Sequence, residues 1–246
     1  TEFTSACKAL SNQLDTSFVN GVAVIVANPL QSASFRKEAV KATIESDAEF
    51  FRVYDSNGNE LPSQVRKISD NKKEITFIAE VLSCSLTAYD IRESEQPTEI
   101  KTQLTVSDRI IENRNIKVTL DSNGDICSVF DKRIEKELIG EPIRLAVLNN
   151  THSFDWPAWE IKYDDLCGQP YMYPTSPDIS IVDNGPALCS IRINRKAGKS
   201  TFNQLISLDC ESEYISIHNE TDWREESSLL KAQFNFTVQN DFASYD

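Results

Sequence analysis

Hydrophobic and polar residues alternate along most of this chain, which is the pattern of β-strands that bury one face. The pattern is clearest between Ile110 and Lys132, where apolar and polar residues alternate through 116–120 and the turn sequence Asp121-Ser-Asn-Gly124 follows. Asparagine and glycine tolerate the positive φ that tight hairpin turns need, and an apolar run resumes at Ile126. This stretch therefore predicts a β-hairpin.

Shorter alternating runs fill the rest of the chain. Before the hairpin, runs between turn residues predict the strands of a small antiparallel sandwich at 22–27, 36–44, 50–54, 65–68, 74–82 and 85–91. Apolar residues at alternate positions from Ile75 to Val81 predict one buried face. After the hairpin we expect strands at 144–148, 179–183, 187–194, 202–208, 213–218 and 229–238. The last has its large apolar residues on one face, so we expect it to be covered or paired on both edges.

Two segments break the strand pattern. Phe3, Cys7, Leu10 and Leu14 are spaced by three and four positions, which predicts a short N-terminal amphipathic helix. Residues 93–104 form a charged, proline-containing stretch without useful periodicity, which predicts a linker. We therefore expect an all-β fold in two parts, with a short helix in front and the small sandwich at 21–92.

Composition narrows the classes of partner and chemistry. The net charge is -13 and the pI is about 4.7, and such a surface repels phosphate, so we expect no nucleic-acid partner. No apolar run of about 18 residues and no export leader is present, so we expect no membrane partner. The six cysteines are widely spaced, without a CxxC pair, which favours free thiols in the core over a zinc site. Cys189 lies on the apolar face of its run, among Ala187, Ile191 and Ile193.

Five motifs, in this order, resemble the C-terminal half of glycoside hydrolase family 38, the zinc-dependent α-mannosidases. They are Asn28-Pro-Leu30; Val53-Tyr-Asp-Ser-Asn-Gly58 with Leu61-Pro-Ser-Gln-Val65; Ile111-Glu-Asn113 with the hairpin and Asp131-Lys132; Trp156-Pro-Ala-Trp-Glu-Ile161; and Thr221-Asp-Trp-Arg-Glu225 with Leu229-Leu-Lys231. Together these motifs extend over nearly the whole chain.

The resemblance implies a fold for this chain, and it implies which domain of a family member is catalytic. Family members have a catalytic barrel with zinc and a nucleophilic aspartate, a helical bundle, a small β domain and a mutarotase-like supersandwich. By this resemblance, residues 1–16 are the helical tail of the bundle and 21–92 an immunoglobulin-like sandwich. The linker at 93–104 then leads to the larger antiparallel supersandwich at 105–246, which we expect to be truncated. The family's HxD zinc motif and barrel aspartate are absent, so we assign no catalytic, cofactor-binding or metal residue to this chain.

The tryptophan-rich stretch is the best candidate for contact with a sugar. Indole faces stack on pyranose rings, so Trp156 and Trp159 could form a platform, with Asp155 and Glu160 accepting hydrogen bonds from hydroxyls. The alternative is that both tryptophans pack a domain interface, because large aromatic residues are mostly buried. The family usually has Asp where this chain has Pro157, so that hydrogen-bond acceptor is lost here.

Two other sets of residues are weaker candidates. His152, Asp155 and His218 would make a poor metal site, because the histidines lie far apart in the sequence. His152, His218 and Glu220 could be imagined as a ring-opening acid–base set, but only their residue types favour it. For Trp223, packing is the favoured interpretation.

We therefore expect a non-catalytic C-terminal β region of an α-mannosidase, which buttresses the catalytic barrel of the parent protein and is inactive alone. Zinc and the hydrolysis of α-mannosidic linkages in glycans belong to that parent by resemblance. The alternatives are a carbohydrate-binding module for mannose-containing glycans and a purely structural module. The exposure of Trp156 and Trp159 separates these two.

Overall fold

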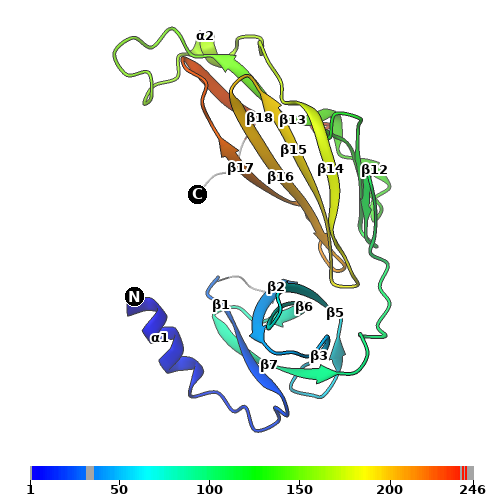
Figure 1. Ribbon diagram of the computed structural model, residues 1–246. Coiled ribbons are helices and arrows are strands. Elements are labelled where there is room, and N and C mark those ends of the chain that lie inside the picture. The colour runs from blue at the N-terminus through cyan, green and yellow to red at the C-terminus, as the bar shows by residue number, and fades with distance from the viewer. Residues whose placement is uncertain (1, 32–35, 239, 241, 243–246) are drawn as a thin grey trace. The chain divides into compact units, whose positions relative to one another are not determined.

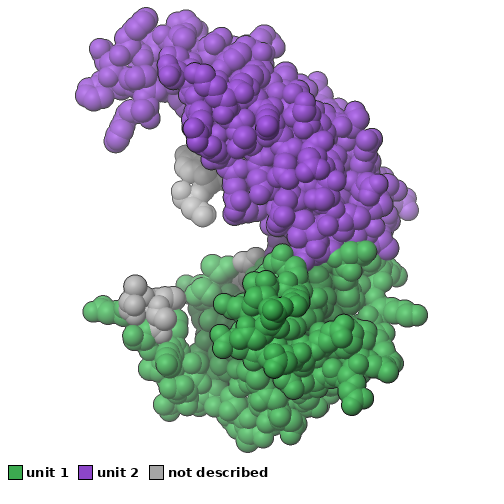
Figure 2. Space-filling model, viewed as in Figure 1, with its two compact units in different colours: residues 1–104, 184–189, 209–212 green, residues 105–183, 190–208, 213–246 purple. Residues whose placement is uncertain are grey.

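The computed structural model describes residues 2–31, 36–238, 240 and 242. Its contacts divide the chain into two compact units, coloured separately in Figure 2. The first unit contains residues 1–104, 184–189 and 209–212, and the second contains 105–183, 190–208 and 213–246. The predicted linker at 93–104 lies within the first unit.

The first unit is a β-sandwich preceded in the sequence by one helix (Figure 1). Its elements are α1 (Glu2–Ser11), β1 (Val22–Asn28), β2 (Arg36–Glu45), β3 (Phe50–Tyr54), β4 (Glu60–Leu61), β5 (Ser63–Ser69), β6 (Lys72–Val81) and β7 (Ser85–Ser94). One sheet has the order β1-β7-β3-β4 and the other β2-β6-β5, with antiparallel neighbours in both. The prediction of short antiparallel strands is thus confirmed, although the two-residue β4 was missed.

The core between these sheets follows from the alternation in the sequence. Ile75, Phe77, Ala79 and Val81 are all buried on one face of β6, as predicted. The Phe77 ring lies 5.1 Å from that of Tyr89 on β7, centroid to centroid. The Tyr89 hydroxyl also donates to the Glu80 carbonyl and accepts from the Glu80 amide, both at 2.8 Å. A buried aromatic residue with a satisfied hydroxyl therefore joins the two sheets.

The second unit contains the remaining strands and one short helix. Its elements are β8 (Thr105–Ser107), β9 (Ile110–Glu112), β10 (Ile116–Leu120), β11 (Ile126–Asp131), β12 (Lys136–Glu137), β13 (Ile139–Asn149), α2 (Tyr163–Leu166), β14 (Thr175–Asn184), β15 (Leu188–Ala197), β16 (Ser200–Asp209), β17 (Ser216–Asp222) and β18 (Ser228–Phe236). The last residue of β14 (184), the first two residues of β15 (188–189) and the last residue of β16 (209) are counted with the first unit.

Two sheets make up this unit. One has the order β18-β13-β11-β10-β9-β8, with β12 paired to β11, and the other has the order β14-β15-β16-β17. The all-β prediction is therefore confirmed. The strand expected at 213–218 is displaced, because the hydrogen-bond ladder with β16 runs from Ser216 to Asp222 and not along the apolar residues before it.

β18 differs from the prediction that it would be paired on both edges or covered. Along the described residues it pairs with β13 alone and ends the sheet. Phe234 and Phe236 on its outer half are exposed, and their rings stack with centroids 6.1 Å apart. Leu230, nearer its start, packs against the core around Val147. Apolar alternation thus marked the strand but did not establish that its whole apolar face is buried.

The predicted hairpin is formed by β10 and β11. Gly124 has φ of +78°, and the Asp121 carboxylate accepts hydrogen bonds from the amides of Asn123 (2.8 Å) and Asp125 (3.0 Å). This is an aspartate-stabilised turn with glycine at the position that needs a left-handed backbone. An extra strand, β9, pairs with β10 on its other edge, so the stretch from Ile110 contributes three strands and not two.

A buried ion pair holds the hairpin turn in place. The Arg195 guanidinium, on β15, contacts the carboxylate of Asp125 and the side-chain oxygen of Gln204. It also donates to the Asn123 carbonyl at 3.2 Å. Both charged side chains are almost inaccessible to water, so each depends on the other for its polar interactions.

The six cysteines, all within the described part of the chain, form no disulfide. Cys189 and Cys210 are buried, but Cys84, Cys127 and Cys167 are exposed, so a place in the core was wrong for these three. Burial raises the pKa of the Cys210 thiol to about 12.

Among the described residues, neither helix has the length and apolar character that crossing a membrane requires.

Candidate functional site

The candidate site is the tryptophan loop, residues 150–162, which connects β13 to α2 at one end of the second unit (Figure 1). Its entry is fixed to the sheet, since the Asn150 amide donates to the Ser227 carbonyl at 2.8 Å. Beyond α2 the chain returns beside β13 through a bridge between Val147 and Met172. The loop therefore projects from the end of β13, and the chain on either side of it is hydrogen-bonded to the sheet.

A single helical turn arranges the two tryptophans. The Trp156 carbonyl accepts from the amides of Trp159 (3.0 Å) and Glu160 (2.9 Å). Pro157 suits the first position of such a turn because its φ is already near the helical value. The Pro157 carbonyl accepts from the side-chain amide of Asn150 at 2.8 Å. Residues three and four apart share one side of a turn, so both indoles and Glu160 line one open hollow of about 540 Å³.

Both indoles in this hollow are exposed, with 66% of Trp156 and 90% of Trp159 accessible. Neither is packed within the second unit, and neighbouring Phe154 is also exposed. Packing against another part of a parent protein stays a prediction. Asp155 is exposed and precedes Trp156 in the sequence, but it does not line the hollow.

The Glu160 carboxylate is ionised and already engaged. It accepts from Lys162 Nζ at 2.6 Å and from Ser153 Oγ at 3.4 Å. The hydrogen bond from Lys162 lowers the pKa of Glu160 by more than burial raises it, and the positive charge of Lys162 and the hydrogen bond from Ser153 lower it further. A carboxylate in this state accepts hydrogen bonds from hydroxyl groups, as contact with a sugar requires.

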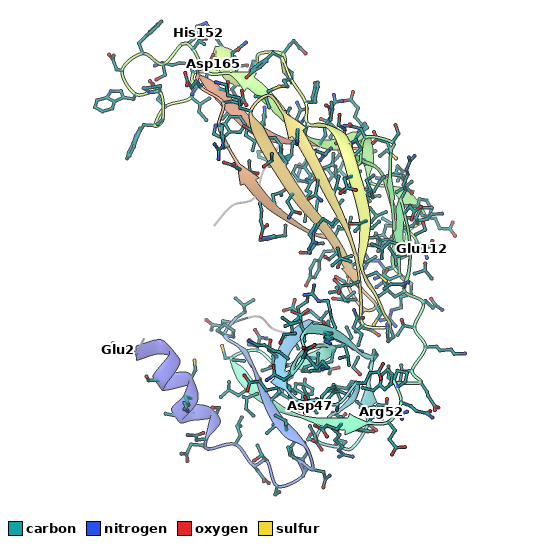
Figure 3. The ribbon with its side chains drawn as sticks, in the orientation of Figure 1. Glu2, Asp47, Arg52, Glu112, His152 and Asp165 are labelled. Atoms are coloured by element: carbon teal, nitrogen blue, oxygen red, sulfur yellow. The ribbon has the colours of Figure 1, made fainter. Side chains whose placement is uncertain are left out.

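His152 is paired with a residue that sequence reasoning missed. Its Nδ1 lies 2.7 Å from Oδ1 of Asp165 on α2, and Figure 3 shows the two side chains together at this end of the unit. Asp165 also accepts from the amides of Thr151 (3.2 Å) and His152 (3.1 Å), and its side chain is 1% exposed. The only sequence signal was the pair Asp164-Asp165 in a stretch without periodicity.

The other candidates do not gain support as metal or ring-opening sites. His152 is bound to Asp165, while His218 lies on exposed β17, with Nε2 3.7 Å from Glu220 Oε1. In the part of the chain that the structure describes, no three His, Cys, Asp or Glu residues are grouped to hold a metal ion. Trp223 packs edge-on against Phe202, with centroids 6.4 Å apart, as the packing interpretation expected.

Comparison with known proteins agrees with the resemblance in the sequence. Residues 111–246 match the family described as Glycosyl hydrolases family 38 C-terminal domain, and this match covers β10 to β18 and the tryptophan loop. The chain is also similar to Alpha-mannosidase G of Dictyostelium discoideum, with 25% identity over 158 residues. That similarity covers 61% of this chain but 14% of the relative. The chain belongs to the C-terminal domain family of the family 38 glycosyl hydrolases.

Proposed function

We propose that this chain is a non-catalytic β region of an α-mannosidase and buttresses the zinc-containing catalytic barrel of its parent. The observation that carries the proposal is the family match over residues 111–246, together with a relative named as an α-mannosidase. In this proposal the parent hydrolyses α-mannosidic linkages in glycans, and the barrel supplies the zinc and the catalytic carboxylate. The role of this chain is to support that barrel.

The exposed apolar residues of the second unit support a buttressing role. Phe154, Trp156 and Trp159 on the tryptophan loop and Phe236 on β18 leave large apolar areas open to solvent. Apolar surface of this kind gains free energy when another domain covers it.

Hydrolysis of an aryl α-mannoside by the purified 246-residue chain, with and without zinc, tests the proposal. We expect no turnover above the blank in either condition. Turnover that co-elutes with the chain on gel filtration and is retained through a second, orthogonal purification would overturn it. A preparation from host cells without the chain controls for contaminating glycosidases.

A second candidate function is carbohydrate binding by the tryptophan loop. It is favoured by one observation, the exposure of Trp156 and Trp159 around a hollow shared with Glu160. Indole faces stack on the apolar faces of pyranose rings, while Glu160 and Asp155 accept hydroxyl hydrogen bonds. The ligand class would be mannosides, by the family to which the chain belongs.

Titration with mannobiose, followed by tryptophan fluorescence, tests this second function. The chain has three tryptophans, so a Trp223→Phe background leaves only the two loop tryptophans to report. We expect a saturable change that Trp156→Ala abolishes. Absence of any response at millimolar sugar would favour a purely structural module.

A further inference from the structure

The pair formed by His152 and Asp165 closes the base of the tryptophan loop. Asp165 reaches back across fourteen positions to Thr151 and accepts three hydrogen bonds, from two backbone amides and from Nδ1 of His152. The carboxylate is buried, whereas the imidazole is 57% exposed and open to exchange of its proton with solvent. The contact therefore has one fixed partner and one partner that can titrate.

Other hydrogen bonds of the loop lie within it or at its first residue. The Trp156 carbonyl accepts from two amides, Asn150 binds the Pro157 and Ser227 carbonyls, and Glu160 accepts from Ser153 and Lys162. The indoles of Trp156 and Trp159 are exposed and contribute little packing of their own. Their positions thus depend on how the base of the loop is held.

We infer that His152 and Asp165 act as a proton-operated clasp, in which protonated His152 holds the tryptophan loop in the form that presents both indoles to a sugar. The sugar part of this inference rests on the carbohydrate-binding function proposed above. His152 and Asp165 would be positioning residues, because neither lines the hollow that would receive the sugar. Loss of the His152 proton loosens the loop, and sugar affinity falls with it.

The charges around the pair set the direction of this response. The hydrogen bond with Asp165, helped by the charges of Asp165 and Asp164, raises the pKa of His152 above 6.5. Burial alone would raise the pKa of Asp165, but the hydrogen bonds from His152 and the two amides outweigh it and lower the pKa below 3.8.

Other charged groups near the clasp are already engaged. Within the loop, Glu160 is paired with Lys162 at 2.6 Å. From β18, Lys231 donates to the Leu166 carbonyl of α2 at 3.4 Å.

The sign of the pH dependence follows from these two shifts. Because the contact with Asp165 raises the pKa of His152, protonated His152 stabilises the closed loop fully below pH 6.5. This stabilisation is lost as the pH rises through the pKa that His152 has in the closed loop. Because the hydrogen bonds to Asp165 lower its pKa, ionised Asp165 stabilises the closed loop above pH 3.8. This stabilisation is lost as the pH falls through the pKa that Asp165 has in the closed loop. The contact between His152 and Asp165 is therefore strongest between pH 3.8 and pH 6.5.

The dissociation constant for mannobiose, measured by tryptophan fluorescence on the full chain, tests the clasp. A neutral imidazole still donates one hydrogen bond, so we expect affinity to weaken about two- to tenfold between about pH 5.5 and about pH 8.5. His152→Asn keeps a donor near the position of Nδ1 but cannot titrate, so its affinity should be flat over this range. His218→Asn changes the only other histidine of the chain and should leave the profile of the unaltered chain in place. A flat profile in the unaltered chain, or an unchanged one in His152→Asn, would overturn the inference.

A measurement without sugar separates the clasp from the platform. The amides of Thr151 and His152, which bind Asp165, should lose protection against hydrogen exchange on raising the pH over the same range, relative to an unstructured peptide of the loop sequence. The loss should be absent in His152→Asn, and amides in β13 should stay protected in both. If no sugar binds at any pH, the platform fails and these protection factors decide the clasp. Protection that does not change with pH would overturn it.

Discussion

The turn at 121–125 and the tryptophan loop both belong to the second unit, yet they place side chains in opposite environments. The turn buries charged groups, because Asp125 lies against Arg195 in a region closed to water. The tryptophan loop leaves large aromatic groups in solvent and buries one carboxylate, Asp165, at its base. Each region departs from the usual rule that charges lie outside and aromatic residues inside.

The difference indicates where stability and binding are concentrated. A buried ion pair with several hydrogen bonds cannot lose one partner without leaving the other unsatisfied. An exposed indole can be lost at little cost to folding. Changes at the turn should therefore act on unfolding, and changes in the loop should act on its local order and ligands.

The largest expected effect is at Arg195. In Arg195→Met the Asp125 carboxylate stays buried without its cation, so the free energy of unfolding should fall by about 3–5 kcal/mol. Urea unfolding followed by circular dichroism measures the loss. The double variant Arg195→Met with Asp125→Leu removes both charges and should recover much of it. A loss below about 1 kcal/mol in the single variant would show that the pair does not hold the turn.

The second largest loss of stability is expected at Gly124. Its turn has the same sequence, Asp-Ser-Asn-Gly, as the turn that ends at Gly58, so the two glycines can be compared. Gly124 and Gly58 both have positive φ, +78° and +80°. A Cβ at Gly124 would lie 2.7 Å from Cγ2 of Ile193, whereas one at Gly58 would meet nothing within 4 Å. Backbone strain and crowding together should make Gly124→Ala cost about 2–4 kcal/mol, against about 1 kcal/mol of strain alone for Gly58→Ala. Equal losses in urea unfolding would contradict the role of Ile193.

The two turns also indicate what the sequence could predict. Their aspartates accept the same pattern of backbone hydrogen bonds, as turn chemistry alone suggests. The sequence did not reveal that one turn lies in solvent and the other beneath β15. Periodicity placed Ile191 and Ile193 on an inward face, and Arg195 occupies the next inward position. Its partner, Asp125, lies 70 residues away in the sequence, so local sequence patterns could not predict the pair.

The candidate site was predictable to a smaller extent. Trp156, Trp159 and Glu160 were chosen by residue type, and the turn that puts them around one hollow follows from spacings of three and four. Asp165 was missed because a buried carboxylate is recognised by its hydrogen-bond partners, and these form only when the loop closes. Likewise, the apolar alternation of β18 could not tell that Phe236 is exposed.

A third effect is confined to the loop. Asp165→Ala removes the acceptor for the Thr151 and His152 amides, so protease cleavage within 150–162 should be faster, on the order of tenfold. The urea midpoint of the second unit should change little, because only the loop opens. Glu226→Ala, an exposed change near the same end, serves as a control and should leave cleavage unchanged. A large fall in the urea midpoint would mean that the clasp supports the sheet as well as the loop.

The smallest effect on stability is expected at the exposed tryptophans. Trp156→Ala and Trp159→Ala should each change the free energy of unfolding by less than about 0.5 kcal/mol. Trp223→Ala is the matched comparison, since it removes a ring that packs on Phe202, and it should cost about 2 kcal/mol or more. A large loss at Trp159 would show that the loop is packed in solution.

The contact between Asp125 and Arg195 also bears on the order of folding. β10 and β11 are adjacent in the sequence and can pair as a local hairpin, but Arg195 reaches the turn only after the chain has closed a loop of 70 residues. We expect Gly124→Ala to slow folding and Arg195→Met mainly to speed unfolding. The ion pair would then determine the unfolding rate of the second unit, and the hairpin would determine its folding rate.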